Sequence, residues 1–162
     1  MDLTIEAVVN DIRTQYRERP PNGWLLGWER ERYLLLVQEA CAPHAVVNAT
    51  SFDYAFCNRY EVNLSEGDAG IFYMLAVRLS FIAPVFSLHW TRYESQTKGS
   101  VVSSVPSDCS QLEEKLRKTL ERAGLTGLPD EWFEQEVSGV ELELSGTSNV
   151  TIGKCLFEDY EG

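Results

Sequence analysis

Apolar residues recur with a helical period at the start of this chain, with a strand period in its middle, and with a helical period again after that. In residues 3–19, apolar residues recur every three or four positions with charged residues between them, which predicts an amphipathic helix. Residues 24–41 are ambiguous, because the first part alternates like a strand and the second part has a helical face. We favour a short extended piece followed by a helix that ends near residues 42–43.

The middle of the chain, residues 46–93, has the period of two that is typical of β-strands. Alternating runs fall at residues 52–56, 60–64, 71–81 and 85–93. Residues 65–70 predict a turn, and Pro84 breaks the pattern because it cannot donate to a strand ladder. Short connections of this kind favour antiparallel neighbours. Residues 98–106 are expected to form a loop or an irregular edge.

Residues 107–123 give the clearest helical signal, with three leucines spaced four apart on one stripe. Two pairs at i,i+4 support the opposite face, Glu113–Arg117 and Glu114–Lys118. The start can be capped by Ser107, by Asp108 or by the pair Ser110–Glu113. Gly124 is suited to end the helix.

The last quarter predicts a short helix that begins at Pro129 and a closing hairpin over residues 140–157. With 162 residues, of which 44% are hydrophobic, the chain suits one compact domain. We therefore predict a single α+β domain over residues 1–162. It would have an antiparallel sheet of about five or six strands packed with three or four helices.

Charge is distributed unevenly along the chain. From residue 129 to the end there are nine carboxylates and one lysine, a net −8 of the formal −11. A protein that binds a phosphate backbone should carry a basic patch, so we expect neither direct nucleic-acid binding nor docking on anionic lipid. A field of one sign instead speeds the encounter with an oppositely charged protein.

The segment 128–137 is the best candidate for a protein contact, because it sets aromatic residues beside carboxylates, as interface hot spots with charged rims do. The predicted partner-binding residues are Asp130, Glu131, Trp132, Glu134, Glu136, Glu141 and Glu143. A structural alternative is that Trp132 and Phe133 cover the sheet while the acids face water. Charged residues near an edge strand also block unwanted strand pairing.

Reactive side chains are few. The histidines are His44 and His89, and the four cysteines stand far apart without metal-ligand spacing. We expect no metal site, no cofactor and no catalysis. If the chain were an enzyme, Cys57 and His89 would be the first residues to consider. The first residues lack a signal-peptide pattern, which favours a cytoplasmic protein with reduced thiols.

One resemblance concerns the last quarter of the chain. Residues 150–159, Val-Thr-Ile-Gly-Lys-Cys-Leu-Phe-Glu-Asp, follow Gly-Val-Glu-Leu-Glu-Leu at residues 139–144. This pattern resembles the tail of small bacterial immunity proteins of polymorphic or contact-dependent toxin systems, which are acidic α+β proteins. The resemblance implies stoichiometric binding to a partner toxin and transfers no functional residues.

We therefore expect an inhibitor that neutralises a cognate toxin, such as a basic nuclease, through its acidic C-terminal surface. One alternative is a small cytoplasmic hydrolase or transferase with a Cys/His or carboxylate site. Another is an adaptor subunit that inhibits nothing. The sequence leaves the oligomeric state open.

Overall fold

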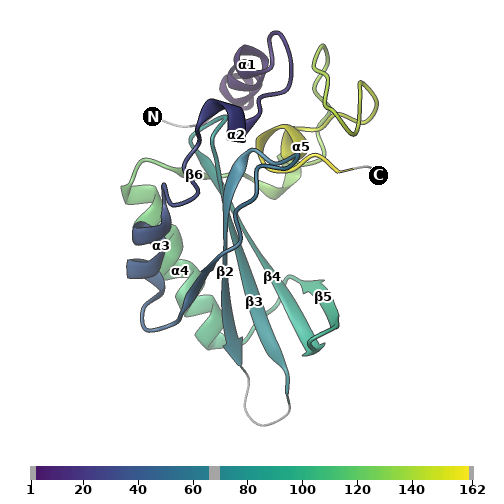
Figure 1. Cartoon of the computed structure of the whole chain (residues 1–162). Coiled ribbons are helices and arrows are strands. Elements are labelled where there is room, and N and C mark those ends of the chain that lie inside the picture. The colour runs from purple at the N-terminus through teal and green to yellow at the C-terminus, as the bar shows by residue number, and fades with distance from the viewer. Residues whose placement is uncertain (1–2, 66–69, 161–162) are drawn as a thin grey trace.

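The computed structural model describes residues 3–65 and 70–160, and this part of the chain forms an α+β domain built on an open sheet (Figure 1). The five main strands are β1 (Val46–Asn48), β2 (Cys57–Ser65), β3 (Phe72–Ser80), β4 (Val85–Ser95) and β5 (Lys98–Val102). They pair antiparallel in chain order, and a short strand β6 (Thr126–Gly127) pairs parallel with the start of β4. The predicted fold class and the largely antiparallel sheet are confirmed.

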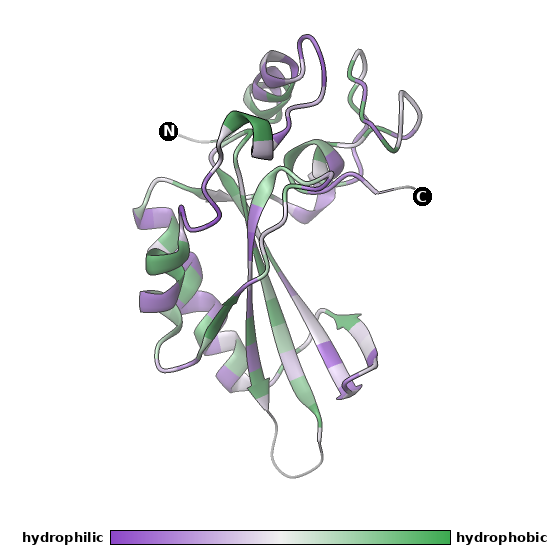
Figure 2. Cartoon of the chain, viewed as in Figure 1, coloured by the Kyte–Doolittle hydropathy of each residue, from purple (hydrophilic) through white to green (hydrophobic). Residues whose placement is uncertain are grey.

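The helices fall into two groups (Figure 1). The described helices are α1 (Ile5–Gln15), α2 (Gly23–Leu26), α3 (Leu34–Cys41), α4 (Ser107–Arg122), α5 (Ile152–Leu156) and a 3-10 turn η1 (Asp130–Trp132). Helices α3 and α4 cover one face of the sheet, whereas α1, α2 and α5 gather at one end of it. Figure 2 shows hydrophilic residues mainly on the outer sides of α3 and α4.

Each group of helices encloses its own hydrophobic core. The leucine stripe of α4, which includes Leu116, packs on alternate residues of β2, β3 and β4, among them Tyr60 and Leu75. A second core lies at the end of the sheet, where Ile12 of α1 meets Phe157 and its neighbours from the C-terminal region. Most of the alternate residues of β2–β4 that point to the opposite face of the sheet belong to neither core. This face is therefore not covered by the two groups of core residues.

Several local predictions are confirmed. Residues 5–15 and 107–122 are helical, and the ion pairs Glu113–Arg117 and Glu114–Lys118 form at 3.6 and 3.1 Å. Gly124 follows α4 with a positive φ of 91°. No side chain caps the start of α4, however; its N-cap is Pro106, so the predicted capping residues do not act as caps. Most of the predicted turn at 65–70 lies outside the described residues.

Two predicted extended segments are wrong. Residues 23–26 form the short helix α2, because the Asn22 side chain accepts hydrogen bonds from the N–H groups of Trp24 and Leu25, and Gly27 ends the turn with φ 74°. Residues 52–56 form no strand, since Tyr54 has φ 55° and only an isolated bridge forms beside it. The helix predicted for the second part of residues 24–41 is confirmed as α3.

The predicted hairpin over residues 140–157 is also wrong. Leu142 and Gly146 close a tight loop, and the chain then turns into α5, whose start is capped by Thr151. By contrast, residues 98–102, predicted as a loop or an irregular edge, form the edge strand β5, with a register shift between Tyr93 and Ser95 of β4.

Candidate functional site

The face of the sheet opposite α3 and α4 carries the most unusual group of side chains. In the described part of the chain no helix covers it along the lower half of β2–β4, and residues 130–134 border it (Figure 1). A hollow of about 490 Å³ opens on this face. Its lining residues are Arg59, Ala76, Arg78, His89, Thr91, Val101, Asp130, Phe133 and Glu134. We call it the sheet hollow.

Arg78 lies on the floor of the sheet hollow, and neutral groups hold it. Its Nε donates to the Ser87 hydroxyl at 3.1 Å, and its Nη2 lies 3.3 Å from His89 Nδ1. The guanidinium also lies 5.0 Å from the ring centre of Phe157 and 6.0 Å from that of Phe133. Burial lowers the pKa of Arg78. Among the described residues, no carboxylate forms an ion pair with it.

His89 completes this arrangement. Burial lowers the pKa of His89, and the nearby positive charge of Arg78 lowers it further. A neutral imidazole keeps a lone pair, so Nδ1 can accept the Arg78 N–H while Nε2 carries the ring proton. The edge of the His89 ring meets Phe133, with the ring centres 5.4 Å apart. The structure therefore places a donor-rich floor beneath the segment that carries the predicted acids.

The acidic segment turns its carboxylates outward and its aromatic rings inward. Asp130 and Glu134 are exposed at the sheet hollow, and Glu131 and Glu136 are exposed nearby. Trp132 is half-buried against the core at the end of the sheet. The Trp132 ring therefore packs the segment against the domain, and only part of the ring is exposed to a partner.

Not all seven predicted contact residues share one surface. Glu141 and Glu143 are exposed on the loop that replaces the predicted hairpin. Glu143 lines a separate small crevice together with Pro20 and Tyr54, apart from the residues of the sheet hollow. The structure thus brings Asp130 and Glu134 to the sheet hollow and places Glu143 elsewhere.

Cys57 and His89 do not come together as a catalytic pair. The Cys57 thiol is buried, donates to the Phe157 carbonyl at 3.5 Å, and has its pKa raised to about 12 by burial. Cys57 lies opposite Ser80 on β3, whereas His89 lies opposite Ala76. Four residues along a strand span roughly 13 Å, too far for a proton transfer between the two side chains.

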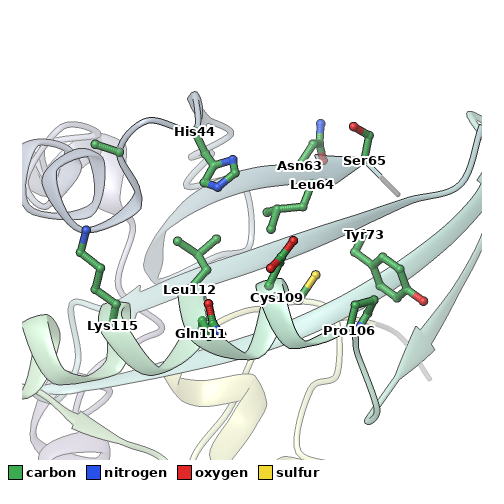
Figure 3. Close-up of a pocket in the computed structure, with 12 residues that line it drawn as sticks. His44, Asn63, Leu64, Ser65, Tyr73, Pro106, Cys109, Gln111, Leu112 and Lys115 are labelled. Carbon is green, nitrogen blue, oxygen red and sulfur yellow. The ribbon is translucent and has the colours of Figure 1, made fainter. Parts of the chain in front are cut away.

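A second pocket, of about 630 Å³, lies at the start of α4 (Figure 3). Figure 3 shows side chains of α4 facing His44 and the ends of β2 and β3 across this pocket. Cys109, Asp108 and His44 all line it, with the Cys109 thiol buried at the base. Sequence patterns do not reveal this grouping, because His44 and Cys109 are far apart in the chain and share no motif.

The remaining reactive groups are simpler. All four cysteine side chains are buried, and none of them forms a disulfide bond. Among residues 3–65 and 70–160, no three side chains of the metal-binding types gather into a potential metal site. Over the same residues, no helix has the length and apolar character needed to span a membrane.

Comparison with known proteins adds no relative to this description. No protein-family model matches the chain, and neither a curated protein nor a solved structure matches it. The side chains of the sheet hollow and of the pocket at α4 are therefore the features that bear on function.

Proposed function

We propose that this chain is a protein-binding inhibitor, an immunity-type protein that neutralises a cognate toxin. The observation that carries the proposal is the position of Asp130 and Glu134, two exposed carboxylates that border an uncovered sheet face. A toxin with a basic active surface, such as a nuclease, would be attracted to this border. Most of the net charge of −11 lies in the same part of the chain and adds to that attraction.

The same face offers apolar contact area beside the charges. Phe72 and Tyr93 stack across β3 and β4 with ring centres 4.8 Å apart, and both rings are half-buried. They belong to the same set of alternate positions as Arg78 and His89. Aromatic area beside a charged rim is the composition that protein interfaces use for affinity and orientation. The face therefore suits a protein partner.

Inhibition would follow from occlusion. Carboxylates at the rim would contact the lysines and arginines with which a nuclease holds phosphate groups, and the body of the domain would exclude the substrate. Electrostatic attraction raises the association rate of such complexes, whereas buried contacts slow dissociation. The adaptor alternative differs in that its partner would remain active in the complex.

The test uses the product of the reading frame adjacent to the gene, expressed in a bacterial host. If this product arrests growth, co-expression of the wild-type chain should restore it. We expect the double variant Asp130→Lys/Glu134→Lys to lose the rescue, and the association rate at low salt to fall about tenfold or more. The matched control Glu39→Lys/Glu121→Lys makes the same charge change on exposed positions of α3 and α4.

Two results would contradict the proposal. A toxic product whose action the wild-type chain does not relieve removes the inhibitor function. Equal effects of the two double variants on association would mean that total charge, and not the border of the sheet hollow, guides the encounter.

The pocket at α4 supports a second candidate, a thiol-dependent hydrolase or transferase. Its observation is that Cys109, His44 and Asp108, a nucleophile, a base and a carboxylate, line one pocket. An activated Cys109 would react with iodoacetamide near neutral pH faster than an ordinary thiol, and His44→Ala would remove the excess rate. A Cys109 that reacts no faster than Cys41 would eliminate this candidate.

A further inference from the structure

We propose that the sheet hollow binds a carboxylate side chain of the protein partner, an Asp or Glu flanked by basic residues, between Arg59 and Arg78. The identity of the partner rests on the proposed inhibitor function. The anion site itself is independent of that function, because it follows from the charges and distances within this chain.

Two like charges, Arg59 and Arg78, line the sheet hollow. Arg59 lies directly opposite Arg78 in the register of β2 and β3, and like charges at such positions destabilise a sheet. Arg59 has a partner, since its Nε lies 3.0 Å from Glu61 Oε2. Arg78 has only neutral hydrogen-bond partners, Ser87 and His89. The floor of the hollow therefore holds a positive charge that forms no ion pair with a described carboxylate, and the charge of Glu158 acts on it only from farther away.

The sheet hollow has room for a side chain above Ala76. Ala76 lies on the same face two residues from Arg78, opposite Glu61 on one side and His89 on the other. Its small side chain leaves room above the sheet, and the hollow of about 490 Å³ can accept a carboxylate side chain. The rings of Phe133 and Phe157 restrict the guanidinium of Arg78.

Several hydrogen-bond donors line the sheet hollow. A guanidinium edge pairs with a carboxylate through two parallel N–H bonds, a geometry that a planar carboxylate fits well. The Nε2 proton of a neutral His89 and the hydroxyl of Thr91 supply further donors at the lining of the hollow. A buried carboxylate would thus find the partners that its burial requires.

The acidic residues at the rim of the hollow select the kind of ligand that can supply this carboxylate. Asp130 and Glu134 stand at the hollow and would repel an isolated anion. A segment whose acidic residue is flanked by Lys or Arg satisfies both the floor and the rim. A nucleic acid does not, because its closely spaced phosphates would meet these acids and a net charge of −11.

The first experiment places a carboxylate in the hollow from within. Ala76→Asp sets an acid beside Arg78 and His89 and opposite Glu61, and Ala76→Asn is its uncharged match at the same position. We expect the pKa of His89, followed by NMR, to be higher by about 1 in Ala76→Asp than in Ala76→Asn, because a nearby anion favours the imidazolium. Equal His89 pKa values in the Asp and Asn variants would overturn the site.

The second experiment uses blocked peptides as probes at fixed ionic strength. Lys-Glu-Lys should shift the NMR signals of Arg78 and His89 in a saturable manner, and Lys-Gln-Lys should bind at least about tenfold more weakly. Arg59 is half-buried, and Arg59→Gln should lower the affinity for Lys-Glu-Lys to that for Lys-Gln-Lys. Acetate that binds as well as the peptide would point to a free small carboxylate, and inorganic phosphate that binds more tightly would overturn carboxylate selectivity.

The growth assay separates the two proposals. If Ala76→Asn rescues the host and Ala76→Asp does not, the partner anchors in the hollow. If both rescue fully, partner anchoring is overturned while the inhibitor function survives. If the wild-type chain rescues nothing, the inhibitor function fails, and the peptide titration still decides whether the hollow takes a carboxylate.

Discussion

Gly153 gives the sharpest test of how the candidate site is held in place. This residue lies in the first turn of α5, and a Cβ added to it would meet Phe133 Cδ1 at 2.7 Å and the Phe133 carbonyl oxygen at 3.1 Å. Phe133 stacks on Phe157 with ring centres 5.7 Å apart and adjoins Asp130 and Glu134 at the sheet hollow. Gly153→Ala should therefore push on the segment that carries the candidate contact residues.

Local and tertiary effects of Gly153→Ala have opposite signs. Replacing glycine by alanine in a helix gains up to about 1 kcal/mol from backbone propensity. Forcing an extra carbon into a filled space costs about 1–3 kcal/mol. Because the nearest ring atom is at 2.7 Å, we expect the steric effect to win and the variant to lose about 1–2 kcal/mol of unfolding free energy. That loss corresponds to a fall in Tm of about 2–8 °C for a domain of this size.

Urea unfolding of the wild type, Gly153→Ala, Phe133→Ala and the double variant measures the coupling between the two positions. Without the Phe133 ring, Gly153→Ala should be close to neutral or stabilising, with a coupling energy of about 1–2 kcal/mol. A Gly153→Ala variant that is more stable than the wild type, with no coupling to Phe133, would refute the packing of α5 against this segment.

Three further predictions concern the rest of the fold. Burial lowers the pKa of His89 in the folded protein, so the unfolded chain binds more protons than the folded chain as the pH falls below about 6.5. The free energy of unfolding of the wild type should therefore decrease there. His89→Gln should make the urea midpoint less dependent on pH. Leu116→Ala should lower the free energy of unfolding, measured in urea, by about 3–4 kcal/mol because Leu116 is 0% exposed. Leu35 is 74% exposed, so Leu35→Ala should lower it by less than about 0.5 kcal/mol. Asp159→Ala removes two hydrogen bonds of 2.7 Å and should lower the free energy of unfolding, measured by thermal unfolding, by about 2–4 kcal/mol. The control Glu158→Ala changes an exposed residue and should leave this free energy nearly unchanged.

The loop that carries Glu141 and Glu143 illustrates a limit of the sequence pattern. Residues 140–144 alternate like a strand, yet the buried carboxylate of Asp159 accepts from the Leu144 N–H and the Ser145 hydroxyl and holds a turn there. Alternation predicts which side chains are buried, and Val140 and Leu142 are indeed buried. It cannot predict that a residue 15 positions later will bind the backbone.

The short helix α2 is a second place where residues alternate like a strand but do not form one. Trp24, Leu26 and Trp28 alternate, but the Asn22 side chain caps a helical turn instead. Phe52 supports that turn by meeting the rings of Trp24 and Trp28 edge to face. The local cap is visible in the sequence, whereas its aromatic support comes from a segment that only the fold brings near.

Elements with a long periodic signal can be predicted from the sequence alone. Helix α4 and strands β2–β4 follow from spacing, because a residue's face in a helix or strand depends only on its position in the repeat. The pairing of Arg59 with Arg78, the contact of His89 with Phe133 and the position of Asp130 beside them arise from the folded arrangement of the strands and loops. These neighbours come from separate strands and a distant loop, and strand register is a property of the pair of strands, which neither sequence segment specifies alone.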